Sequence, residues 1–198
     1  MSLFGRKKKK EPAPAPKPAA PAPKPAAPAP APKPAAPAPA PVSAERQEAL
    51  KVYRMFKDYL DGIYFRYTPL DEELVITLRA NGNGLPMDVL IRVLEDRKVV
   101  QVLIPLSCKV PEDKRVDGAV AVSVANYGII NGSFDYDFND GKILFRTTHS
   151  YRGVSMTKET IRYLVQVSCS TTDKYGDKFF ALCKGLMTLE QFIEKEKE

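Results

Sequence analysis

Residues 132–146 read GSFDYDFNDGKILFR, and they carry the clearest structural signal in the chain. From Ser133 to Phe138 polar and aromatic side chains alternate strictly, and this period of two predicts a strand with one buried face. Asn139–Lys142 has the composition of a tight turn, and Ile143–Arg146 returns as a second, apolar strand. The stretch therefore predicts a β-hairpin in an antiparallel sheet.

Three earlier segments also have the composition of strands, namely Leu74–Arg79, Met87–Leu94 and Lys98–Pro105. Turn residues separate them, at Asn81-Gly82-Asn83-Gly84 and again at Glu95-Asp96-Arg97. The glycine-rich turn lacks the Gly-Lys-Ser/Thr ending of a phosphate-binding loop, and it precedes a strand where such a loop precedes a helix. We therefore expect a three-stranded meander, with the short stretch Tyr64–Tyr67 leading into it.

Helical spacing predicts a first helix that begins at the N-cap Ser43 and has Gly62 as its C-cap. Its apolar residues recur on one face, at Ala49, Val52, Tyr53, Phe56, Leu60 and Ile63. Thr157 is a second candidate N-cap, and it precedes the stripe Ile161, Leu164, Val165 and Ser168. A further helical segment is expected around Phe179–Leu186, and the capping-box spacing of Thr188–Gln191 predicts a last short helix.

The segment from Val110 to Tyr127 admits two interpretations. Pro111 followed by two acidic residues is typical of a helix start. The apolar stripe expected for that helix is Val116, Ala119, Val120, Ser123 and Tyr127. Val120, Val122 and Val124 also alternate, so a strand remains the alternative, although the spacing favours a helix.

In chain order these elements predict an α+β fold. We expect an antiparallel sheet of about five strands in α-β-β-β-α-β-β-α order, with the helices packed on one face.

The start of the chain has a different composition. Pro12–Pro41 contains only proline, alanine and lysine, which removes backbone donors and favours extended polyproline conformations. We therefore expect a disordered tail at 1–42 and one folded domain at 43–198. The tail holds eight basic residues against Glu11, a net charge of +7, so the domain carries −1 of the chain's total of +6. A nucleic-acid-binding domain would need a basic face of its own.

The tail contains one dense cluster of charge, formed by Arg6, Lys7, Lys8, Lys9 and Lys10. Such a cluster can bind an anionic membrane surface or nucleic acid, and it can also be a solvated spacer that only keeps the protein soluble. These five residues are the candidate electrostatic contact of the tail.

No recognisable constellation for catalysis, cofactor binding or metal binding is present. His149 is the only histidine, and no motif places a nucleophile and an orienting acid beside it. Asp135, Asp137 and Asp140 lack the spacing and the final glutamate of a calcium loop. The three cysteines, Cys108, Cys169 and Cys183, are widely spaced among apolar neighbours, which is typical of reduced, buried thiols in a cytoplasmic protein. No apolar stretch is long enough to span a membrane, and no secretion signal follows the basic start.

Several segments of the domain resemble the YbjN family of bacterial sensory transduction regulators. The resemblance rests on Val110–Arg115, Asn126, Gly132–Asp137, Asp140-Gly141 and Ile143–Arg146, with the helix near Thr157 and Asp173–Tyr175 after it. It implies a fold similar to type III secretion chaperones, a helix around Val120, a tendency to form homodimers, and no known catalytic residues.

From these observations we expect a non-catalytic protein-binding or regulatory module, a dimeric adaptor that binds a protein or peptide segment. The alternative is a regulator tethered to an anionic membrane or to nucleic acid through its basic tail.

Overall fold

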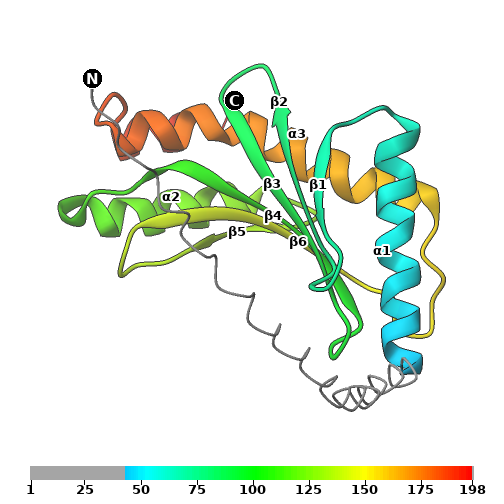
Figure 1. Ribbon diagram of the computed structural model, residues 1–198. Helices are drawn as coiled ribbons and strands as arrows, with labels where there is room; N and C mark the ends of the chain where they lie inside the picture. The colour runs from blue at the N-terminus through cyan, green and yellow to red at the C-terminus, as the bar shows by residue number, and fades with distance from the viewer. Residues whose placement is uncertain (1–42, 198) are drawn as a thin grey trace, which may run out of the picture. The chain divides into compact units, whose positions relative to one another are not determined.

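The computed structural model describes residues 43–197, which contain six β-strands, four α-helices and one short 3-10 helix (Figure 1). The helices are α1 (Ala44–Gly62), α2 (Arg115–Tyr127, preceded by the 3-10 turn Glu112–Lys114), α3 (Lys158–Cys183) and α4 (Leu189–Lys195). The strands are β1 (Tyr67–Leu70), β2 (Val75–Asn81), β3 (Pro86–Leu94), β4 (Val99–Lys109), β5 (Ser133–Tyr136) and β6 (Lys142–Ser150). The expected tail, 1–42, lies outside the described residues.

All six strands form one antiparallel sheet in the order β1-β2-β3-β4-β6-β5. The meander and the hairpin are confirmed, since β2, β3 and β4 are consecutive neighbours and β5 pairs with β6. The sequence predicted about five strands, and β1 is the additional one. It is a four-residue edge strand that contains Pro69, whose missing N–H is tolerated only at an edge or bulge.

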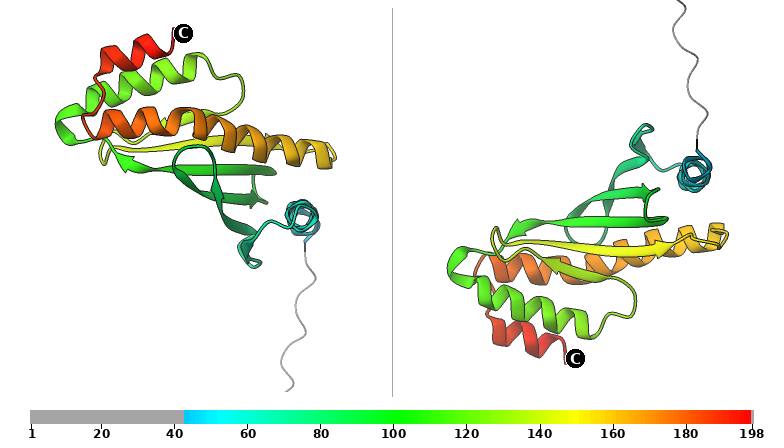
Figure 2. Two further views of the ribbon diagram at one scale, coloured as in Figure 1. Left: turned by 90° about the horizontal axis from the view of Figure 1, so that it is seen from above. Right: turned by 90° about the horizontal axis from the view of Figure 1, so that it is seen from below.

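The helices pack on one face of this sheet, as expected. The long helix α3 lies along β4 and β6, and α2 and α4 pack beside it (Figure 2). Alternate strand residues on that face are buried, and one continuous core includes Ile76, Ile91, Val102 and Phe145. At its centre the ring of Phe134 contacts those of Phe145 and Phe179 at centroid distances of 5.0 and 4.9 Å.

Helix α1 begins where the sequence predicted, because the Ser43 side chain accepts a hydrogen bond from the Arg46 N–H. Its end differs from the prediction. Gly62 is the last helical residue and not the cap, and the chain turns at Tyr64, which has a φ of 55°. The Tyr64 and Phe65 N–H groups donate to the Asp61 and Leu60 carbonyls, the pattern of a Schellman motif, so a tyrosine takes the position that glycine usually occupies.

Helix α2 confirms the helical interpretation of residues around Val120. Its buried face, however, consists of Gly118, Ala121, Val122 and Ala125, and the expected apolar stripe is wrong. A β-carbon on Gly118 would lie 2.8 Å from a Val110 methyl, so small residues allow the helix to approach its neighbours closely. The larger apolar residues of α2 consequently face outward.

The two helical segments expected after Thr157 form one continuous helix, α3, of 26 residues. Its polar middle is accommodated inside the fold, because the hydroxyl of buried Ser168 donates to the Leu164 carbonyl and lies 2.9 Å from the Thr147 hydroxyl. The capping box predicted at Thr188–Gln191 is present and begins α4.

Candidate protein-binding face

The helices leave the other face of the sheet uncovered, and this open face is the candidate functional surface. Residues paired across antiparallel strands point to the same side of a sheet. Leu90 on β3 lies opposite Leu103 on β4. Pro105, two residues after Leu103 on β4, lies opposite Leu144 on β6. We call these four residues, Leu90, Leu103, Pro105 and Leu144, the apolar floor.

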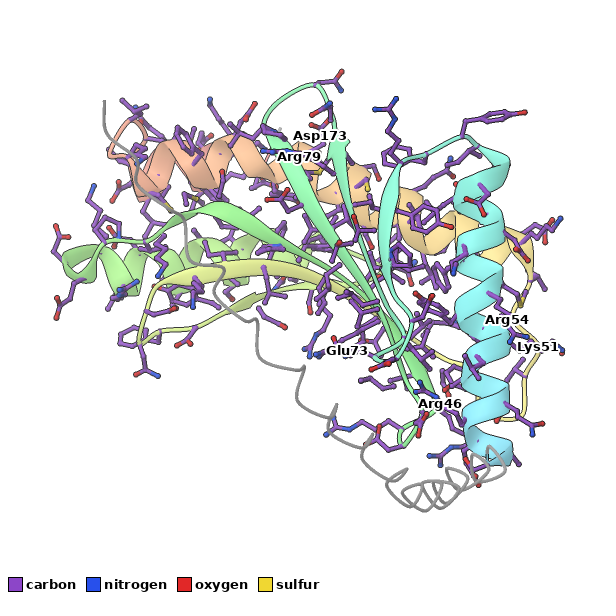
Figure 3. The ribbon with its side chains drawn as sticks, viewed as in Figure 1. Arg46, Lys51, Arg54, Glu73, Arg79 and Asp173 are labelled. Atoms are coloured by element: carbon purple, nitrogen blue, oxygen red, sulfur yellow. The ribbon has the colours of Figure 1, made fainter. Side chains whose placement is uncertain are left out.

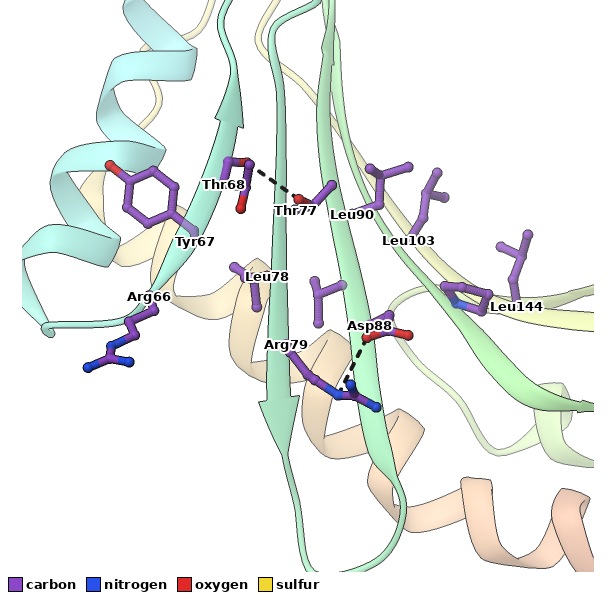
Figure 4. Close-up of a pocket in the computed structure, with 12 residues that line it drawn as sticks. Arg66, Tyr67, Thr68, Thr77, Leu78, Arg79, Asp88, Leu90, Leu103 and Leu144 are labelled. Atoms are coloured by element: carbon purple, nitrogen blue, oxygen red, sulfur yellow. Dashed lines mark hydrogen bonds and ion pairs between the residues drawn. The ribbon is translucent and has the colours of Figure 1, made fainter.

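A concavity of about 680 Å³ lies over the apolar floor (Figure 4). Its lining comes from β1 to β4, from β6, and from Arg66 just before β1. Figure 4 shows α3 behind the strands, on the side of the sheet away from these side chains. The strand hydrogen bonds hold the backbone beneath the concavity, so the floor is preformed.

This surface was not predicted from the sequence, although the composition of β4 indicates it. Val99–Leu106 is apolar at every position except Gln101. A strand with only one buried face alternates, whereas a nearly continuous apolar run is typical of a strand that is covered on both sides. The helices cover one side of β4, and the other side is apolar although no helix of residues 43–197 covers it.

Charged side chains surround the floor and are mostly paired. Arg79 Nε lies 3.7 Å from an Asp88 carboxylate oxygen, and Arg146 donates to Asp135 at 3.0 Å. These pairs are partly or largely exposed to solvent, so each contributes little to stability. They form a polar rim around an apolar centre, which is the usual anatomy of a protein interface.

A second apolar surface lies on α2. Val116, Val120 and Tyr127 lie on its outer side, with Ile130 just beyond its end, and they are 67%, 37%, 97% and 95% exposed. We call these four residues the outer stripe of α2. No charged residue occurs from 118 to 134. An exposed helix normally carries charges on its solvent side, so this neutral surface is also typical of an interface.

His149 lies on β6 at a cavity of about 460 Å³ between that strand and α3. Asn131, Glu159, Thr160 and Tyr163 also line this cavity, but no serine or cysteine does. A histidine-activated serine or thiol nucleophile is therefore not assembled there.

The three acidic residues considered for a cation do not converge on one. Asp135 pairs with Arg146, and Asp140 pairs with Lys142 and Lys109. Asp137 accepts a hydrogen bond from the backbone N–H of Asn139 within its own turn. Within 43–197, no group of three or more His, Cys, Asp or Glu side chains could hold a metal ion.

The remaining sequence predictions concern the thiols, the tail and the membrane. Cys108 and Cys183 are buried and Cys169 is half-buried, and all three are free. The cluster Arg6–Lys10 lies outside the described residues. None of the helices in the described part is long and apolar enough to cross a membrane.

Known structures share this fold at low sequence identity. YbjN from E. coli has a TM-score of 0.50 and 13% identity, over 65% of this chain and 91% of that one. A chain of the ExsC–ExsE complex has a TM-score of 0.46 and 14% identity, over 64% of this chain and 92% of that one. A chain of the HopA1–SchA chaperone–effector complex has a TM-score of 0.49 and 9% identity, over 69% and 99%.

No curated protein sequence matches the chain. The family model YbjN, described as "Putative bacterial sensory transduction regulator", matches residues 55–181. The matched region runs from α1 into the last turn of α3 and includes the whole sheet and α2. It covers well over half of the chain, and the resemblance found in the sequence is thereby confirmed: this chain belongs to the YbjN family.

Proposed function

We propose that the domain is a non-catalytic, cytoplasmic regulatory module that binds an extended segment of another protein on the open face of its sheet. One observation carries the proposal: an apolar floor, formed by Leu90, Leu103, Pro105 and Leu144, lies uncovered in a concavity of about 680 Å³. Burying a fully exposed leucine contributes about 1.5–3 kcal/mol. Leu90, Leu103 and Leu144 are already half-buried, so a segment that covers the floor gains part of this free energy from each of them.

The composition of β4 supports the same proposal. A strand apolar on both sides is costly on an uncovered sheet, because its partly exposed leucines favour aggregation unless a partner binds there. The description of the family as a regulator points in the same direction.

The working form of the module is proposed to be a homodimer joined through the outer stripe of α2. Val116, Val120, Tyr127 and Ile130 together expose on the order of 500 Å² per copy, so two stripes would bury about 1,000 Å², the lower limit for a specific interface. A neutral surface can meet its own copy without repulsion between like charges. Two copies related by a twofold axis would present the same stripe to each other.

The cluster Arg6–Lys10 supports a second, separate proposal, that the tail binds an anionic surface. Five adjacent basic residues would release counterions from a lipid surface or from DNA, so binding should weaken steeply with salt. Replacing all five with glutamine in the full chain should abolish sedimentation with phosphatidylserine vesicles or a shift of duplex DNA. Unchanged sedimentation and unchanged DNA binding would contradict it.

The proposed segment-binding function is tested by affinity capture from native lysate with three baits. They are the full chain, its Leu103→Asp variant, and the control Leu186→Asp, whose leucine is 76% exposed in the loop after α3. A protein retained by the full chain and by the control, but reduced at least tenfold by Leu103→Asp, supports the proposal. Equal retention by all three baits would contradict it. A fourth bait, residues 43–198, shows whether the tail is needed.

A further inference from the structure

The charges around the apolar floor do not cancel. The two acidic residues on the open face of the strands are both paired, Asp88 with Arg79 and Asp135 with Arg146. Each carboxylate thus has an arginine of the domain beside it, which offsets its charge. The arginines are in excess.

Two arginines near the floor have no acidic partner in the part of the chain that the structure describes. Arg66 is exposed and lines the concavity beside β1. Arg92 is half-buried on β3, two residues from Leu90 and on the same face, and its Nε donates to the Gln101 side chain at 2.8 Å, a neutral acceptor. Both guanidinium groups therefore retain donors for an anion.

A covering segment would remove water from these two groups. A buried or half-buried guanidinium without an anion loses hydration that a neutral partner replaces only in part. A carboxylate replaces it with charge-assisted hydrogen bonds, often two at once, whereas a lysine or arginine adds repulsion. The two arginines at the rim thus favour a negatively charged segment over a positively charged one.

We infer that the segment bound on the open face is acidic, with leucine-like side chains on the apolar floor and flanking aspartate or glutamate residues paired with Arg66 and Arg92. This inference rests on the proposed function and specifies the partner. It also argues against one occupant, the chain's own tail, because residues 1–42 carry eight basic residues and one acidic residue. The tail has the wrong charge for the rim.

The test uses the full chain and three fluorescein-labelled peptides of twelve residues. The peptides share four leucines at the same positions and differ at four others, which are all glutamate, all glutamine or all lysine. Fluorescence anisotropy gives the dissociation constants at low and at high salt. The glutamate peptide should bind about tenfold more tightly than the lysine peptide, and the difference should shrink at high salt because these charges are solvent-accessible.

Two variants assign the effect to the two arginines. The double variant Arg66→Gln/Arg92→Gln should remove most of the advantage of the glutamate peptide and leave binding of the glutamine peptide unchanged. Arg54→Gln is the matched control, because Arg54 is exposed on α1, away from the concavity (Figure 3). Arg54→Gln should change neither the advantage of the glutamate peptide nor the binding of the glutamine peptide.

The outcomes separate this inference from the proposed function. If all three peptides bind equally and Leu103→Asp abolishes their binding, the face binds segments but the charge inference is wrong. If the lysine peptide binds best, or if the glutamate peptide does not bind, the inference is also overturned. The proposed function itself is judged independently by capture with Leu103→Asp.

Discussion

The carboxylate of Asp173 on α3 accepts hydrogen bonds from the backbone N–H groups of Asn83 and Gly84 in the turn between β2 and β3. Both bonds are 3.1 Å long, and the Asn83 side chain donates a third to the same carboxylate. Figure 3 shows Asp173 on α3 beside this turn. The turn resembles an anion-binding loop in its glycine content, but the anion that it holds is part of the domain itself. The interaction joins the meander to the long helix.

The approach of Asp173 requires glycine at 82. A β-carbon there would lie 2.0 Å from Asp173 Oδ1, so Gly82→Ala must displace the carboxylate. We expect Gly82→Ala and Asp173→Ala each to lower the free energy of unfolding by about 1 kcal/mol, the usual range for an exposed, charge-assisted hydrogen bond. The double variant should be little worse than either, because both remove the same contact. Urea unfolding of the four proteins measures this, and additive losses would contradict the coupling.

The same contact predicts a difference in acid stability. The N–H groups of Asn83 and Gly84 lower the pKa of Asp173 in the folded state. A lowered pKa contributes stability above the unfolded value, about 3.9, and loses it as the pH falls through the folded value. Asp173→Asn should therefore be less stable than the wild type at pH 7, and this difference in the free energy of unfolding should shrink as the pH falls below about 4. If the difference in the free energy of unfolding between the wild type and Asp173→Asn stays constant from pH 7 to pH 2, the charge of Asp173 contributes nothing to stability.

The three thiols should be unreactive in the folded domain. Burial raises the pKa of Cys169 to about 11, with a smaller contribution from Asp173. The neighbouring Cys183 lowers the pKa of Cys108, but both of these thiols are buried and shielded from the reagent. Since the thiolate is the reactive species, an aromatic disulfide reagent at pH 8 should react slowly with the native protein and rapidly with three thiols in guanidinium chloride. Fast release of one or more equivalents of the reagent's aromatic thiolate by the native protein would mean that a thiol is accessible.

The outer stripe of α2 should determine the oligomeric state. Val120→Glu places a charge on the proposed interface and should convert the dimer into a monomer, as measured by sedimentation equilibrium. Val154→Glu introduces the same charge at an exposed valine outside the stripe, and it should leave the dimer intact. A wild-type protein that is monomeric at micromolar concentration, or a dimer that tolerates Val120→Glu, would exclude this interface.

The sequence predicted those parts of the fold that depend on local patterns. The hairpin at residues 132–146 alternates and contains its own turn, and Ser43, Thr157 and Thr188 act as the N-caps that their side chains favour. The edge strand β1 was not predicted, because four residues that include Pro69 give no alternation. It is ordered only by pairing with β2, which is a tertiary effect.

Two other errors have a common cause, the assumption that size and polarity report burial. On α2 the valines and the tyrosine were expected inside, but close packing against Val110 and Tyr136 selects Gly118. In α3, by contrast, Ser168 is buried as the predicted stripe implied, and Thr172, between the two helical segments expected there, is buried as well. The open face was missed for the same reason, since a period of two does not say which apolar residues remain uncovered.

The most direct test of the account is a contact made at the apolar floor in living cells. The photoreactive amino acid benzoylphenylalanine would replace Leu103 in the full chain, and a control chain would carry it at Gln166, an exposed position on the opposite, helical side. We expect illumination to produce a covalent adduct between another protein and the chain modified at 103, with none from the chain modified at 166. Identical adducts from both positions, or adducts only with a second copy of this chain, would contradict the claim that the open face binds a segment of a partner.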